Sequence, residues 1–116
     1  EASLAGENHM VLLERGEIMQ FTLHPEEVGL PVYDNDQIRG GDSKQNADIL
    51  LRVLKGEKGA HRDTVLMNAG LGIFAHGKAS TVQEGVKLAE ESIDSGAALN
   101  KLNYLVEFSN RTKQEV

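Results

Sequence analysis

The segment from Asp63 to His76 has almost no polar face, and this constrains the fold more than any other feature of the sequence. Its apolar residues are Val65, Leu66, Met67, Ala69, Leu71, Ile73, Phe74 and Ala75. A helix that is apolar all round is buried, so we expect this one at the centre of the molecule. Its odd polar residue, Asn68, must find partners there, and we expect it to tie the helix to loop backbone.

A second helix is predicted ahead of this one, from about Ser43 to Lys55. Asp42 or Ser43 can serve as its amino-terminal cap, because both side chains accept hydrogen bonds from free backbone amides. The apolar stripe that we expect to face the core is Ala47, Leu50, Leu51 and Leu54.

Two more helices are predicted towards the end of the chain. The first opens with a capping box, Ser80 with Gln83 three positions on, and ends at Ser95–Gly96. Its stripe is Val82, Val86, Ala89 and Ile93. The second carries Ala98, Leu102, Leu105 and Phe108. Helices therefore fill residues 43–108, and residues 109–116 form a polar tail that we expect to fray.

A β-hairpin is predicted within residues 1–24. Met10–Leu13 is apolar at every position, as in a strand covered on both faces, and this indicates further sheet partners upstream. The second run alternates Met19, Phe21 and Leu23 with polar residues. A turn at Pro25 and a loop fill residues 25–42. Strands and helices are thus segregated, which gives the chain by itself an α+β appearance.

Composition excludes several classes of function. Lysine and arginine total 12 against 18 aspartates and glutamates, and the net charge of −6 disfavours binding to nucleic acid or anionic membrane. Cysteine is absent, which excludes thiolate zinc sites and cysteine nucleophiles. Apolar runs are far shorter than the roughly 20 residues of a membrane span, and the start does not have the pattern of a signal peptide. We expect one cytoplasmic domain.

The residues that could carry chemistry are sparse. Gly40–Gly41–Asp42 lacks the spacing of a phosphate-binding loop, and a glycine turn into a capped helix explains it. The four histidines, His9, His24, His61 and His76, have no metal-binding spacing. The sequence has no Gly-x-Ser-x-Gly nucleophile elbow either. From these patterns alone we assign no catalytic and no substrate-binding residue.

Several stretches, in order, resemble the carboxyl-terminal region of the anthranilate phosphoribosyltransferase family. They are Pro25–Leu30, Gly41–Ala47, Val53–Gly59, Arg62–Ala69, Ala75–Ala79, Gln83–Val86 and Ile93–Ala98. The resemblance implies the last third of a parent enzyme and the end of its larger α/β domain, the fold class that we expect. Because Glu1 starts the chain and the first methionine, Met10, lies in a strand, we expect the parent to continue upstream.

The family transfers ribosyl 5-phosphate from phosphoribosyl pyrophosphate to anthranilate in tryptophan biosynthesis, with Mg²⁺ as cofactor. The implied partners are these two small molecules, the upstream part of the same protein and a second copy in a homodimer. An Asp-Glu pair holds metal in the family, and Glu1 matches its second member. The family's Gly-Thr-Gly-Gly-Asp loop is not present, because Ile38–Arg39 stands before Gly40. The Lys-His-Gly-Asn segment and the arginine region that contacts anthranilate are also missing, so we expect the chain alone to be inactive.

Two alternatives from other classes stay open at this point. The first is a paralogue of the same fold that binds nucleic acid, against which the net charge of −6 counts. The second is a helical interaction module with no enzymatic parent, against which the predicted unpaired strand edges count.

Overall fold

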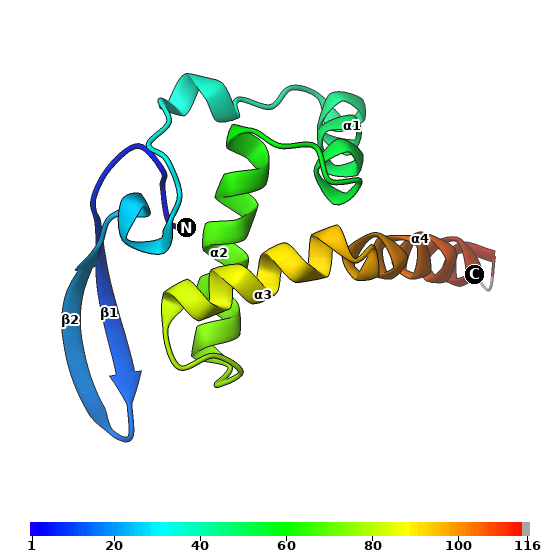
Figure 1. Ribbon diagram of the computed structural model, residues 1–116. Helices are drawn as coiled ribbons and strands as arrows, with labels where there is room; N and C mark the ends of the chain where they lie inside the picture. The colour runs from blue at the N-terminus through cyan, green and yellow to red at the C-terminus, as the bar shows by residue number, and fades with distance from the viewer. Residues whose placement is uncertain (115–116) are drawn as a thin grey trace.

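The computed structural model describes residues 1–114, which form a β-hairpin followed by four α-helices (Figure 1). The strands are β1 (Asn8–Glu14) and β2 (Glu17–Leu23), and two 3-10 turns follow, η1 (Pro25–Val28) and η2 (Asn35–Ile38). The helices are α1 (Ser43–Leu54), α2 (Ala60–Ala75), α3 (Val82–Asp94) and α4 (Ala97–Gln114). The predicted order of a hairpin and then helices is confirmed.

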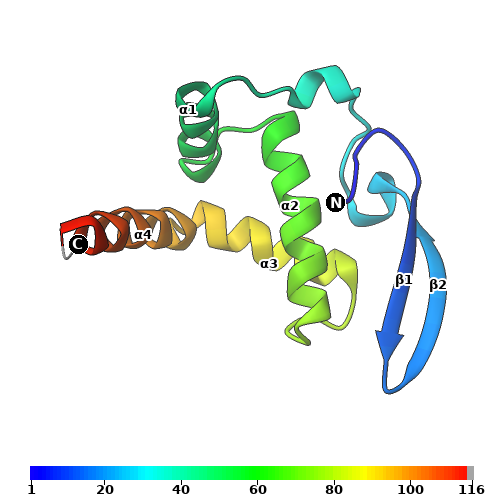
Figure 2. The same ribbon diagram turned by 180° about the vertical axis from the view of Figure 1, so that it is seen from behind.

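Helix α2 stands at the centre, with the hairpin on one side and α3 crossing it on another (Figures 1 and 2). The crossing is close because glycines meet there. A Cβ on Gly70 would lie 2.7 Å from the backbone nitrogen of Val86, and one on Gly85 would strike the carbonyl oxygen of Gly70. A Cβ at either position would be too close to the other helix, so glycine is required at both for the helices to approach this closely.

The core forms around this crossing. Leu66 and Met67 of α2 are almost completely buried, and α3 contributes its predicted stripe, in which Val86, Ala89 and Ile93 are buried and Val82 is partly buried. Segments before the helices complete the core with Ala2, Leu4, Leu23, Val28 and Leu30. The prediction that α2 is buried all round is only partly right. Val65 is 38% exposed and Ala69 is also exposed, because the described elements leave part of the surface of the helix uncovered.

The hairpin forms as predicted, but its burial differs from the prediction. Residues Arg15 and Gly16 both take positive φ, 52° and 80°, which suits the twist of a two-residue turn. Met10 pairs with Phe21 on the face that packs towards the core. On the opposite face Val11 and Leu13 are 70% and 69% exposed, so β1 is not covered on both faces in this chain. The described sheet has two strands, and nothing described covers its outer face.

The predicted stripe of α1 is also wrong in this chain. Ala47, Leu50 and Leu51 are exposed, and Leu54 is partly buried. Val53 is the residue that α1 buries in the core. The broader apolar face of the helix is therefore left largely uncovered by the described residues.

The helix caps follow the predictions with one shift. Asp42 caps α1 by accepting from the Gln45 amide at 2.8 Å, and the Gln45 side chain accepts from the Asp42 amide at 2.9 Å. At α3 the cap is Thr81 rather than Ser80. Its hydroxyl accepts from the Glu84 amide at 3.1 Å, and the Glu84 carboxylate accepts from the Ser80 amide at 3.0 Å.

Two predicted irregular regions are partly helical. The loop after η1 contains η2. Helix α4 runs to Gln114, past the position 109 at which we predicted a frayed tail, and the last two residues of that tail lie outside the described residues. Residues 97–114 contain no glycine or proline to stop the helix, and an Arg111–Glu107 ion pair of 3.2 Å supports its last turns.

The glycine crossing can be tested with two alanine substitutions in α2. Gly70→Ala forces a methyl group against the backbone of α3, and we expect the free energy of unfolding to fall by about 1–3 kcal/mol. Gly72→Ala is the matched control, because a Cβ there has no heavy atom within 4 Å. We expect it to stabilise the chain by up to about 1 kcal/mol through helix propensity. Urea unfolding of both variants measures the difference, and equal stabilities would contradict the close crossing.

Candidate functional site

Residues 2–4 are fastened to the rest of the chain by hydrogen bonds. The Ala2 amide donates to Asn68 Oδ1 at 2.8 Å, and Asn68 Nδ2 donates to the Ala2 carbonyl at 3.0 Å. Asn8 holds Ser3 in the same two-sided way, at 2.8 and 2.9 Å. The Leu4 carbonyl accepts from the Tyr33 amide at 2.9 Å. This segment therefore carries Glu1, whose side chain is exposed, at the end of a fixed backbone.

The prediction for Asn68 is confirmed. Its side chain also donates to the Thr64 carbonyl one turn earlier in α2, at 3.0 Å, so both amide hydrogens are used. Three hydrogen bonds explain how a carboxamide sits within an otherwise apolar stretch.

Tyr33 connects the same segment to the start of α2. Its hydroxyl donates to Asp63 Oδ2 at 2.8 Å. The pKa of Tyr33 is raised above its ordinary value, first because this hydrogen bond to a carboxylate favours the protonated phenol, and then because of desolvation. The residue thus acts as a bridge between Leu4 and Asp63 and stays protonated at neutral pH.

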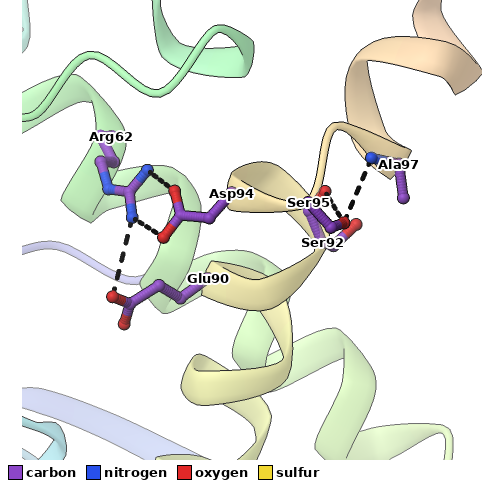
Figure 3. Close-up of polar contacts among 6 residues, drawn as sticks. All are labelled: Arg62, Glu90, Ser92, Asp94, Ser95 and Ala97. Carbon is purple, nitrogen blue, oxygen red and sulfur yellow. Dashed lines mark hydrogen bonds and ion pairs between the residues drawn. The ribbon is translucent and has the colours of Figure 1, made fainter.

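Arg62 makes the main ion pair of the structure, and sequence reasoning did not single it out (Figure 3). Its guanidinium is 4% exposed and binds Asp94 of α3 through two hydrogen bonds of 2.8 and 3.1 Å. Glu90 adds a longer contact of 3.8 Å. Hydrogen bonding to Arg62 lowers the pKa of Asp94, and the same bond raises the pKa of Arg62. A bidentate pair between a guanidinium and a carboxylate has a defined geometry, and this one fixes the orientation of α2 relative to α3.

Further hydrogen bonds connect the end of α3 to the start of α4. The Ser95 hydroxyl donates to the Ser92 carbonyl and accepts from the Ala97 amide, both at 3.3 Å (Figure 3). Arg62 therefore holds the end of α3 from which α4 departs. No signal in the sequence distinguished Arg62 from a surface arginine, because its partner lies 32 positions away.

The glycine turn at Gly40–Asp42 is structural, as predicted. The side chain of Asn46 accepts from the Gly41 amide at 2.8 Å and donates to the Gly41 carbonyl at 3.1 Å. The next amide is that of Asp42, and the Gln45 side chain binds it. Both backbone amides are thus occupied by side chains of α1, and the turn does not present them to a phosphate.

The histidines lie on separate elements: His9 on β1, His24 before η1, His61 in the first turn of α2 and His76 at its carboxyl end. Only His24 has a defined role, since its Nδ1 accepts from the Glu26 amide at 3.3 Å and caps η1. Within residues 1–114, no group of three or more His, Cys, Asp or Glu side chains could hold a metal ion. The described histidines and acids therefore do not form a metal site by themselves.

Glu1 is the one residue that the resemblance offers to magnesium. Its carboxylate is a hard oxygen ligand, is exposed, and stands on a fixed backbone. Magnesium commonly takes only one or two carboxylates from a protein and completes its shell with phosphate oxygens and water. A single exposed carboxylate fits that requirement as one part of a shared site.

Comparison with known proteins agrees with the geometry. A model of the family described as "Glycosyl transferase family, a/b domain" matches residues 1–99. The chain belongs to this family. The match excludes a helical module unrelated to any transferase, which was one of the two alternatives.

Relatives of this a/b domain are anthranilate phosphoribosyltransferases. The chain is 57% identical to the one from Exiguobacterium sibiricum over 115 residues, and 56% identical to one from Bacillus cereus over 116 residues. These alignments cover 99% and 100% of the chain but 33% and 34% of the relatives. The resemblance noted in the sequence is therefore confirmed, and the chain spans about a third of their length.

The fold of this a/b domain is also found in a crystal structure of anthranilate phosphoribosyltransferase from Thermus thermophilus. The TM-score is 0.85 at 41% identity, over 93% of this chain and 32% of that one. The expected α/β class of the parent domain is thus confirmed. In the part of the chain that the structure describes, helices fall short of the length and apolar character needed to cross a membrane.

The Arg62–Asp94 pair makes a prediction about pH. A carboxylate whose pKa is lower in the folded chain stabilises the fold above its unfolded pKa of about 4, and this contribution is lost as the pH falls through the folded value. We therefore expect Asp94→Asn to lower the free energy of unfolding at neutral pH. The difference from the original chain should shrink as the pH falls below about 4.

Urea unfolding across this pH range measures the effect. Asp48→Asn is the control, because Asp48 pairs with Arg52 at 3.2 Å on the surface, with both side chains at least half exposed. We expect it to change stability by at most about 0.5 kcal/mol. An Asp94→Asn deficit that stays constant down to acidic pH would contradict a stabilising carboxylate at this position.

Proposed function

We propose that the chain is one third of an anthranilate phosphoribosyltransferase of tryptophan biosynthesis. The observation that carries this proposal is identity of 55–57% over essentially the whole chain to relatives with that name. The substrates would be phosphoribosyl pyrophosphate and anthranilate. In the transfer, the bond from the ribosyl C1 to pyrophosphate breaks, a bond from the anthranilate nitrogen to C1 forms, and the amine loses a proton.

The part of this chain in the reaction is to present one ligand and to support the rest. Magnesium, when bound, offsets the negative charge of the departing pyrophosphate. Glu1 would supply a carboxylate to that site, held at its place by the hydrogen bonds of Ala2. We assign no residue of the chain to contact with anthranilate, and the remaining two thirds of the parent would supply those contacts.

Exposed apolar surface supports the proposal that the parent covers this chain. On the outer face of the hairpin, Leu13 lies directly opposite Ile18, and their exposed fractions are 69% and 72%. On α4, Tyr104 and Leu105 are 61% and 57% exposed. Soluble monomers rarely leave contiguous apolar patches uncovered. The cytoplasmic location and the homodimer implied by the resemblance remain predictions.

The second candidate is the paralogue of the same fold that binds nucleic acid. The net charge of −6 disfavours it, because nucleic acid binding needs clustered positive charge. The arginine at the helix crossing is not available for phosphate, since Arg62 is buried and paired with Asp94.

The proposal predicts activity for the full-length protein and none for the 116-residue chain. Each is mixed with anthranilate, phosphoribosyl pyrophosphate and Mg²⁺, and the loss of anthranilate fluorescence is followed. We expect loss that depends on Mg²⁺ with the full-length protein only. An inactive full-length protein that instead binds DNA in a salt-dependent manner would replace the transferase by the second candidate.

A further inference from the structure

The carboxamide of Asn68 pairs with residue 2 in the way that one strand pairs with another. It accepts from the Ala2 amide and donates to the Ala2 carbonyl, at 2.8 and 3.0 Å, across 66 positions of sequence. A second hydrogen of the same Nδ2 is bound to the Thr64 carbonyl of the helix itself. The bond to Thr64 therefore fixes the Asn68 side chain on α2, and the same carboxamide binds the backbone of Ala2.

This pairing determines where Glu1 stands. The peptide group between Glu1 and Ala2 is planar and includes the Cα atoms of both residues. Once its N–H is bound to Asn68, the direction to the Glu1 Cα is fixed. Ala2 itself is only 7% exposed, and Leu4 is 2% exposed, so the segment cannot slide without uncovering core residues.

We infer that Asn68 is a positioning residue for the Glu1 carboxylate. Both of its amide hydrogens and its oxygen bind backbone groups, so we assign it no contact with substrate or metal of its own. It acts by holding the peptide that carries the ligand at a set distance from α2. This inference rests on the proposed function, in which Glu1 contributes a ligand to the magnesium site.

A purely structural role predicts something different. If Asn68 only satisfied the polar groups of Ala2, its loss would lower stability and leave metal binding unchanged in the molecules that remain folded. If it positions Glu1, its loss weakens metal binding even where the fold persists. Mutation of a residue that orients a metal ligand typically lowers metal affinity by about 10–100-fold.

The test uses the full-length protein with Mn²⁺ as the probe, and free Mn²⁺ is measured by electron paramagnetic resonance in the presence of phosphoribosyl pyrophosphate. Asn68→Leu keeps the size of the side chain and removes the pairing. We expect its Mn²⁺ dissociation constant to rise about tenfold, with the KM for anthranilate changed less than about twofold. Asp48→Asn is the control, since it removes an exposed ion pair on α1, and its Mn²⁺ dissociation constant should stay within about twofold of the original.

Glu1→Gln separates the positioning role of Asn68 from the metal role of Glu1. If Glu1→Gln weakens Mn²⁺ binding and a folded Asn68→Leu does not, the positioning role is wrong and the proposed function stands. If neither weakens it, the metal role of Glu1 is itself wrong.

Amide hydrogen exchange of the original protein gives a reading that requires no variant to fold. The Ala2 amide should exchange slowly, in step with the amides of α2, because its partner belongs to that helix. Rapid exchange of the Ala2 amide in the folded protein would overturn the inference, even if Asn68→Leu fails to fold.

Discussion

The close crossing of α2 and α3 is the contact on which the rest of the structure depends. Gly70 and Gly85 let the two backbones approach, and the buried Arg62 fixes the helices to each other through Asp94. With its orientation set in this way, α2 becomes the platform for the first residues of the chain. Asn68 holds Ala2, and Asp63 binds Tyr33, whose amide in turn donates to the Leu4 carbonyl.

Two properties of the chain agree with its span of about a third of its relatives' length. Its polar side chains are arranged to join segments of backbone, and none of the described histidines and acids forms a group that could hold a metal ion for a reaction. Large apolar side chains are exposed on the outer face of the hairpin and on α4, two elements that lie at opposite sides of the molecule (Figure 2). Both properties fit a supporting part of a larger domain, and Glu1 is the one metal ligand that we propose for it.

Local sequence patterns predicted the elements well, because their causes are local. The Asp42 cap and the apolar stripe of α3 both depend on residues within a few positions of one another. Burial was predicted less well. Leu50 and Leu51 of α1 and Val11 of β1 are apolar but exposed, since nothing among the described residues covers them. The Arg62–Asp94 pair was missed for a related reason, because two residues far apart in sequence meet only after the helices cross.

Fragment complementation tests the central claim most directly. The 116-residue chain is titrated into the separately produced remainder of the parent, and Mg²⁺-dependent loss of anthranilate fluorescence is measured at each step. We predict no activity from either piece alone and a saturable gain as the two associate. Turnover by the 116-residue chain alone would contradict the account, and so would association of the two folded pieces without any gain in activity.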